Sequence, residues 1–126
     1  MLADNLKQVQ EQIASALDKR KNKDLLTGDN VTLVAVTKNH PPEIITNIEA
    51  LGIANVGENR VQELRDKNAV GAYDGAELHF IGTLQKNKVK YIVDTVDMIQ
   101  SLDSEGLALE IDKRAGKIGK MLPVLI

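Results

Sequence analysis

Apolar residues recur at two spacings along this chain, and the two spacings predict alternating helices and strands. The run VTLVAV at residues 31–36 is almost wholly apolar and rich in β-branched side chains, which is typical of a strand buried on both faces. The polar residues 22–30, with Gly28-Asp29, predict a turn. An amphipathic helix ending near Arg20 is expected before them, because apolar residues there follow steps of three and four: Leu2, Leu6, Val9, Ile13 and Leu17.

The alternation continues after residue 36. Pro41 or Pro42 suits the first turn of a helix, where the N–H that proline lacks has no partner in any case. Gly52 can end that helix in the left-handed conformation. Further strands are expected at residues 53–58, 78–82, 98–102 and 121–126.

Helices are expected between these strands. Ser104 is a plausible N-cap for the last one, and Gly116 and Gly119 are expected to break it. Each helix is marked by apolar residues on one face: Ile44, Ile45, Ile48 and Leu51 in the first, Val61 and Leu64 in the second, Val89, Ile92, Val93 and Val96 in the third, and Leu107 and Ile111 in the fourth.

Five strands alternating with helices predict a single α/β domain with a parallel sheet and right-handed crossovers. An open doubly wound sheet and a (β/α) barrel both satisfy this order. The last strand, MLPVLI, has no polar tail. We therefore expect that the polypeptide continues past residue 126, or that a partner subunit completes it.

Composition narrows the function classes. The chain has 126 residues, a net charge of −2, no cysteine and 2% aromatic residues. Disulfides and thiolate metal sites are excluded, and a stacking surface for nucleic acid or attraction to an anionic membrane is not indicated. No apolar run approaches the roughly 18 residues that span a bilayer, and no signal-peptide pattern is present. A cytoplasmic protein is expected.

Polar residues gather where the predicted strands end, and the carboxyl ends of parallel strands carry functional groups in such folds. Lys38 ends the first strand, and its plain interpretation is an exposed lysine. The alternative is a Schiff-base nucleophile, which must be neutral although the reference pKa of a lysine amine is about 10.4. Partial burial beside the apolar strand would favour the neutral form.

The other strand ends leave similar alternatives. Asn59 is read either as a helix N-cap or as an amide that hydrogen-bonds a ligand, which Gly57 allows to approach the backbone. His79 is favoured as a hydrogen-bonded structural histidine over a catalytic base, and His40 is expected in an exposed loop. Residues 86–90, KNKVK, are favoured as a solvated face, because they lack aromatic partners for nucleic acid. Residues 116–120, GKIGK, do not have P-loop spacing, and two histidines without cysteine disfavour a zinc site.

Four blocks in order resemble one known family: VTLVAVTK, VGENRVQE, LHFIGTLQKNK and SLDS. The chain resembles the pyridoxal phosphate homeostasis proteins, which are similar to the N-terminal barrel of alanine racemase. This resemblance implies a (β/α) barrel of the TIM type, truncated here after about five strands, with residues 1–126 as the N-terminal portion. It implies that pyridoxal 5′-phosphate (PLP) is bound at four positions of this chain: Lys38 as the Schiff-base lysine, Asn59, His79 and Ser101.

The resemblance also implies a role in cofactor and amino-acid homeostasis without established catalysis. In such barrels the phosphate site follows the seventh and eighth strands, so PLP is expected to bind weakly or not detectably to this chain. Self-association through open sheet edges is expected. Two alternatives remain: an alanine-racemase-like enzyme, and a scaffold that binds another phosphorylated small molecule.

Overall fold

The computed structural model describes residues 1–20 and 31–126, which pack as two separate units, residues 1–33 and 34–126. Helix α1 (Leu2–Lys19) lies in the first unit and confirms the predicted amphipathic helix. Asp4 in its first turn and Lys19 in its last turn complement the helix dipole. The turn predicted at Gly28-Asp29 lies outside the described residues.

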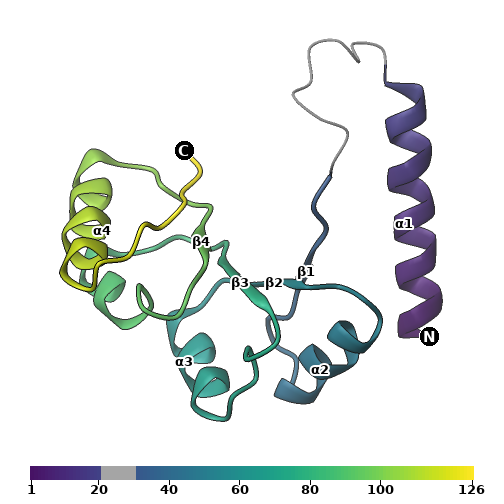
Figure 1. Cartoon of the computed structure of the whole chain (residues 1–126), viewed down its shortest axis with the longest axis horizontal. Helices are drawn as coiled ribbons and strands as arrows, with labels where there is room; N and C mark the ends of the chain where they lie inside the picture. The colour runs from purple at the N-terminus through teal and green to yellow at the C-terminus, as the bar shows by residue number, and fades with distance from the viewer. Residues whose placement is uncertain (21–30) are drawn as a thin grey trace. The chain divides into compact units, whose positions relative to one another are not determined.

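The second unit contains a parallel sheet of four strands in the order β1-β2-β3-β4, drawn in Figure 1. The strands are β1 (Val34–Val36), β2 (Asn55–Glu58), β3 (Glu77–Phe80) and β4 (Met98–Ile99). Each strand pairs with the next one along the chain, and every pairing is parallel. The α/β class and the parallel sheet are therefore confirmed.

Three helical segments connect consecutive strands, and a fourth follows β4. They are α2 (Pro42–Ala50), α3 (Val61–Ala69), the 3₁₀ helix η2 (Lys86–Tyr91) and α4 (Glu105–Lys117). Three local predictions are confirmed. Pro42 occupies the first turn of α2, Gly52 is left-handed with φ of 88°, and Ser104 caps α4 by accepting the Leu107 N–H at 3.1 Å.

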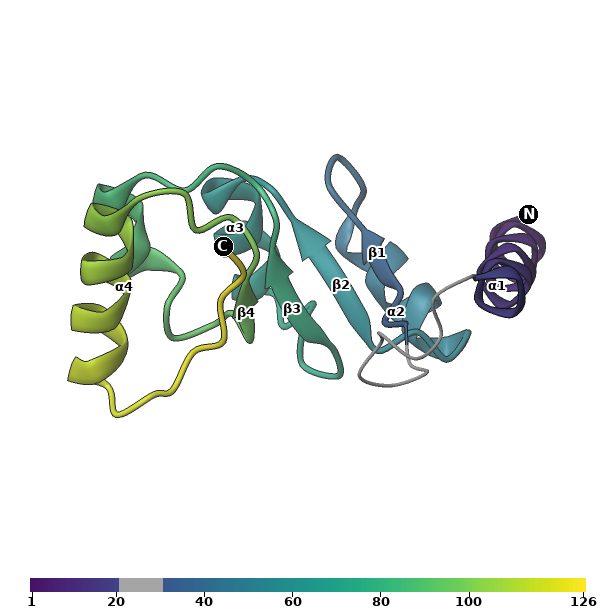
Figure 2. The ribbon, with the colours of Figure 1, turned by 90° about the horizontal axis from the view of Figure 1, so that it is seen from above.

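The two faces of the sheet differ in burial. Helices α2 and α3 lie on the same side of it, as Figures 1 and 2 both show. Val56, Leu78, Phe80 and Ile99 on that side are at most 1% exposed. On the other side, which we call the open face, Val36 is 48% exposed. The prediction that residues 31–36 are buried on both faces is therefore wrong: only residues 34–36 form a strand, at the sheet edge and covered on one side.

The predicted third helix has the expected buried side chains but a different geometry. Val89, Ile92, Val93 and Val96 are all at most 4% exposed, yet only residues 86–91 are helical, as a 3₁₀ helix followed by turns. A 3₁₀ helix stays short because its hydrogen bonds are poorly aligned. The apolar spacing identified what is buried but not the helix type.

The fifth predicted strand, residues 121–126, is not formed. A single parallel bridge joins Ile99 to Val124, with the Ile99 N–H donating to the Pro123 carbonyl at 3.1 Å and the Leu125 N–H donating to the Ile99 carbonyl at 2.9 Å. Proline cannot donate a ladder hydrogen bond, which limits strand formation at this position. The segment nevertheless covers the outer edge of β4.

Candidate functional site

The four residues predicted to bind the cofactor lie on or just after four consecutive strands. Lys38 follows β1, Asn59 follows β2, His79 lies within β3 and Ser101 follows β4. Lys38 and Asn59 follow neighbouring strands, whereas β2 and β3 lie between the strands that precede Lys38 and Ser101. Among the described residues, no hydrogen bond joins any two of these four side chains.

Lys38 lies on a tight turn directly after β1. The His40 N–H donates to the Thr37 carbonyl at 3.2 Å, and Asn39 takes the left-handed conformation with φ of 63°, which asparagine tolerates better than most residues. The Lys38 side chain is exposed, so residues 34–126 do not supply the partial burial considered for it. His40 is exposed, as predicted.

Both peptide groups that flank Lys38 are held by helix α3. On one side, Lys67 Nζ donates to the Thr37 carbonyl at 2.8 Å. On the other side, the Asn39 N–H donates to Glu63 Oε2 at 2.7 Å. Glu63 and Lys67 are one helical turn apart and form an ion pair at 3.2 Å. We call these contacts the α3 clamp.

The clamp is anchored in a buried charge network under the sheet. Glu58 Oε1 accepts three hydrogen bonds, from Thr37 Oγ1 at 2.6 Å, Lys67 Nζ at 2.7 Å and the Tyr73 hydroxyl at 3.1 Å. The Glu58 side chain is fully buried and that of Lys67 is 5% exposed. Because an unpaired charge in such a place is costly, the two side chains constrain each other strongly.

Tyr73 donates a hydrogen bond to Glu58 in this network. Burial, and then the charge of the neighbouring Glu58 carboxylate, raises the pKa of the Tyr73 hydroxyl well above its ordinary value. The phenol therefore stays protonated at neutral pH and donates to Glu58.

His79 makes a hydrogen bond with each ring nitrogen on the open face. Its Nε2 lies 2.9 Å from Asn55 Oδ1, and its Nδ1 lies 2.9 Å from Gln100 Nε2. A neutral ring protonated at Nε2 satisfies both contacts, since the amide oxygen accepts and the amide nitrogen donates. This geometry agrees with the structural interpretation of His79, which links β2, β3 and the end of β4.

Asn59 and Ser101 carry buried oxygens without a hydrogen-bond partner in the described residues: Asn59 Oδ1 and Ser101 Oγ. The N-cap of α3 is Arg60 and no side chain caps it, so the N-cap interpretation of Asn59 is wrong. Buried polar atoms are usually paired. Two predicted cofactor contacts thus have unused hydrogen-bonding capacity, which fits a polar ligand at the carboxyl ends of the strands.

The sequence interpretation missed a cationic cavity of about 470 Å³ between α3 and η2. Arg60, Arg65 and Lys88 contribute positive charge to its lining, and no carboxylate lines it. Arg65 lies 4.5 Å and Lys88 5.7 Å from the centre of the Tyr91 ring. The prediction that the lysines of residues 86–90 lack an aromatic partner is therefore wrong. The aromatic side chain was one residue beyond that segment.

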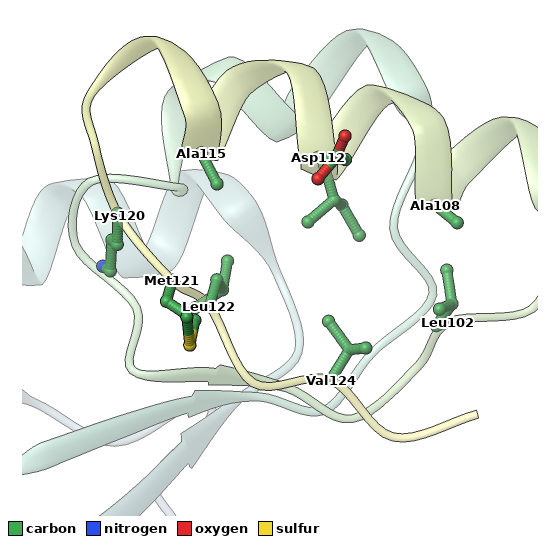
Figure 3. Close-up of a pocket in the computed structure, with 9 residues that line it drawn as sticks. Leu102, Ala108, Asp112, Ala115, Lys120, Met121, Leu122 and Val124 are labelled. Atoms are coloured by element: carbon green, nitrogen blue, oxygen red, sulfur yellow. The ribbon is translucent and has the colours of Figure 1, made fainter.

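A second cavity, of about 370 Å³, lies between α4 and residues 121–124 and is drawn in Figure 3. Its lining is mainly apolar, with Leu102, Ile111 and Val124 among the contributors. None of the four predicted cofactor residues lines it. It is therefore a less suitable place for a polar cofactor than the carboxyl ends of the strands.

Thr37, Glu58, Glu63 and Lys67 were not predicted to support the site. Glu63 and Lys67, four residues apart on a helix, have the spacing of an ordinary exposed ion pair. The sequence did offer one signal. Glu58 is the last residue of a predicted strand, and a carboxylate buried there needs a cationic partner. Nothing in the local sequence identifies Lys67 as that partner.

The sequence is similar to curated proteins named pyridoxal phosphate homeostasis protein. The one from Aquifex aeolicus is 45% identical over 100 residues, which are 79% of this chain and 44% of that protein. The one from Pasteurella multocida is 36% identical over 124 residues, which are 97% of this chain and 52% of that protein. This chain is a homologue of the pyridoxal phosphate homeostasis proteins. It spans about half the length of the curated relatives it matches.

Solved structures agree with this homology. PipY from Synechococcus elongatus PCC7942, with PLP bound, is 36% identical, with a TM-score of 0.70 over 90% of this chain and 51% of PipY. A protein from Bifidobacterium adolescentis is 30% identical, with a TM-score of 0.81 over 98% of this chain and 53% of that protein. No protein-family model matches the chain. The resemblance to pyridoxal phosphate homeostasis proteins is thus confirmed. In residues 1–20 and 31–126, no helix is long and apolar enough to cross a membrane.

Proposed function

We propose that this chain is the N-terminal portion of a cytoplasmic PLP-binding (β/α) barrel that takes part in cofactor and amino-acid homeostasis without catalysis. Lys38 is the residue that forms a Schiff base with the cofactor aldehyde. The homology to pyridoxal phosphate homeostasis proteins and the PLP bound to PipY support the ligand. The single observation that carries the site is the exposed Lys38 on a turn whose two flanking peptide groups are fixed.

The residues at the carboxyl ends of the strands fit the polar groups of PLP. Lys38 supplies the amine, while Asn59 and Ser101 supply buried oxygens that have no partner in the described residues. His79 holds the open face through Asn55 and Gln100 rather than contacting Lys38. When bound, PLP would supply an aldehyde that condenses with an amine with loss of water. We propose weak binding, because the phosphate contacts of such barrels follow later strands.

Trapping with borohydride tests this proposal. The 126-residue chain is incubated with limiting PLP and reduced, so that hydride addition to the C=N bond fixes each adduct as a secondary amine. Peptide mass mapping then gives the share of label on each lysine. We expect Lys38 to carry the largest share and Lys38→Ala to remove it. Lys88→Ala is the matched control, since Lys88 is also exposed and next to a cavity. A label spread evenly, or concentrated on another lysine, overturns the proposal.

The racemase alternative needs a second base opposite the lysine, commonly a tyrosine. Both tyrosines of the chain are engaged elsewhere. Tyr73 is buried as a donor to Glu58, and the Tyr91 ring contacts Arg65, Lys88 and Lys90. We therefore favour the non-catalytic role. Turnover of L-alanine to D-alanine that depends on PLP and Lys38 would favour the enzyme instead.

The cationic cavity favours a second candidate function, binding of another phosphorylated small molecule. Arg60, Arg65 and Lys88 form no salt bridge with a described residue, and no carboxylate lines the cavity. A phosphate ester would pair with such cations. Calorimetric titration with pyrophosphate tests this function. Binding that is lost in Arg65→Ala but kept in Lys38→Ala would support it, and no binding would exclude it.

A further inference from the structure

We propose that Glu63 and Lys67 of α3 are positioning residues for the Lys38 amine. This inference rests on the proposed function, because it assigns the pair a role in presenting Lys38 to an aldehyde. Neither residue is among the predicted cofactor contacts.

The argument begins with what determines the direction of the Lys38 side chain. No hydrogen bond or ion pair to a described residue holds that exposed side chain. The backbone dihedral angles at residues 37–39 therefore set the position of its Cα and the direction of its Cα–Cβ bond, while its χ angles rotate among staggered rotamers. The α3 clamp fixes one hydrogen-bonding group on each side of Lys38, the Thr37 carbonyl and the Asn39 N–H. Because each peptide group is planar, holding the groups on both sides of Lys38 restricts its φ and ψ angles.

The clamp also maintains a backbone conformation that is unfavourable for most residues. Asn39 is the only described non-glycine residue with positive φ, at 63°. Such a conformation persists where neighbouring contacts stabilise it. The bond from the Asn39 N–H to the Glu63 carboxylate is charge-assisted and therefore among the stronger hydrogen bonds.

Helix α3 is itself held against the strands. Lys67 contacts Glu58 at 2.7 Å, and Glu58 is the last residue of β2. The position of the Lys38 turn is thereby tied to the neighbouring strand, after which Asn59 follows. Lys38 and Asn59, which follow β1 and β2, are thus linked by side-chain contacts among Thr37, Glu58 and Lys67.

Glu63 is the better residue to change, because its side chain is 21% exposed and Lys67 keeps Glu58 as a partner when Glu63 is removed. Glu63→Ala removes the acceptor for Asn39. Glu63→Gln keeps an acceptor oxygen without the charge. Glu110→Ala is the matched control, since Glu110 is 22% exposed and pairs with Arg114 at the same helical spacing.

Two measurements are made on each variant: hydrogen exchange of the Asn39 amide, and the share of borohydride-trapped PLP label on Lys38. In Glu63→Ala we expect amide exchange to accelerate about tenfold, as for loss of one charge-assisted hydrogen bond. The Lys38 share should fall several-fold toward that of other exposed lysines. Glu63→Gln should retain most of both properties, and Glu110→Ala should match the unchanged chain.

The outcomes separate the two proposals. If the unchanged chain labels Lys38 preferentially and Glu63→Ala does so equally, the positioning role is overturned. Unchanged exchange of the Asn39 amide in Glu63→Ala overturns it as well. If the unchanged chain shows no preference for Lys38, the proposed function fails first and the positioning role falls with it.

Discussion

Gly82 lies directly against the backbone of Asn59. A methyl group on Gly82 would be 2.4 Å from the Asn59 carbonyl oxygen and 2.8 Å from its Cα. These two residues follow the neighbouring strands β3 and β2. Their close approach sets the distance between two strand exits at the candidate site, so the glycine is required by packing rather than by its dihedral angles.

Gly82→Ala is expected to destabilise the fold by about 1–3 kcal/mol, because backbone atoms cannot move aside as a side chain can. Gly57→Ala is the control. There the added methyl would meet the ends of the Val34 and Ile81 side chains at 3.1 and 3.2 Å, and these can shift. We expect it to cost less than about 1 kcal/mol. Urea unfolding followed by circular dichroism measures both, and equal losses would refute this explanation.

Lys67→Met should destabilise the chain by about 3–5 kcal/mol, because it leaves the Glu58 carboxylate buried without its cation. Arg114→Met removes a cation from a pair in which the side chains are 31% and 22% exposed, and should cost under about 1 kcal/mol. Equilibrium denaturation of both variants at the same pH measures the difference. A cost for Lys67→Met no greater than that of the control would contradict the buried network.

Stability should decline at alkaline pH because of Tyr73. Its pKa is raised in the folded state, first by burial and then by Glu58. Tyr73 therefore makes its full contribution to the free energy of unfolding below about pH 10, the pKa of a tyrosine in the unfolded state. At higher pH this contribution decreases, because only the unfolded state ionises. The slope from this group is at most about 1.4 kcal/mol per pH unit. Urea midpoints from pH 8 to 11 should fall less steeply in Tyr73→Phe. Parallel profiles would argue against the raised pKa.

Ser104→Ala should lower the free energy of unfolding by about 1 kcal/mol, because the Leu107 N–H loses its acceptor at the start of α4. Ser104→Asp should keep nearly full stability, since its carboxylate accepts the same hydrogen bond and complements the helix dipole. Thermal unfolding compares the two. A loss of stability in Ser104→Asp as large as in Ser104→Ala would contradict the capping role.

Self-association is expected through β1, which is the edge strand of the sheet, whereas residues 123–125 cover β4. Val36→Lys puts a charge on this edge strand, where the valine is 48% exposed. We expect a smaller fraction of associated chains in sedimentation velocity at matched concentrations. Val70→Lys is the control, because that valine is 68% exposed but lies after α3, away from the sheet edge. The same change in both variants would exclude β1 as the interface.

The order of the first four strands and of the helical segments around them followed from the sequence alone, whereas the predicted fifth strand did not form. Pro42, Gly52 and Ser104 marked helix boundaries correctly, since each acts through its own dihedral angles or through atoms a few residues away. The rule that parallel strands end at one edge was also sufficient to gather Lys38, Asn59 and Ser101 there. Local chemistry and the period of apolar residues contain this information.

Tertiary structure decided what supports and surrounds those residues. Thr37, Glu58 and Lys67 meet only after β1, β2 and α3 have packed together, and their separations along the chain give no local signal. The same holds for the exposed Lys38 and for the oxygens of Asn59 and Ser101, which have no hydrogen-bond partner among residues 1–20 and 31–126. Burial and hydrogen bonding depend on segments distant in sequence. The sequence therefore determined where chemistry is placed along the strands, and only the packed structure determined how that placement is held.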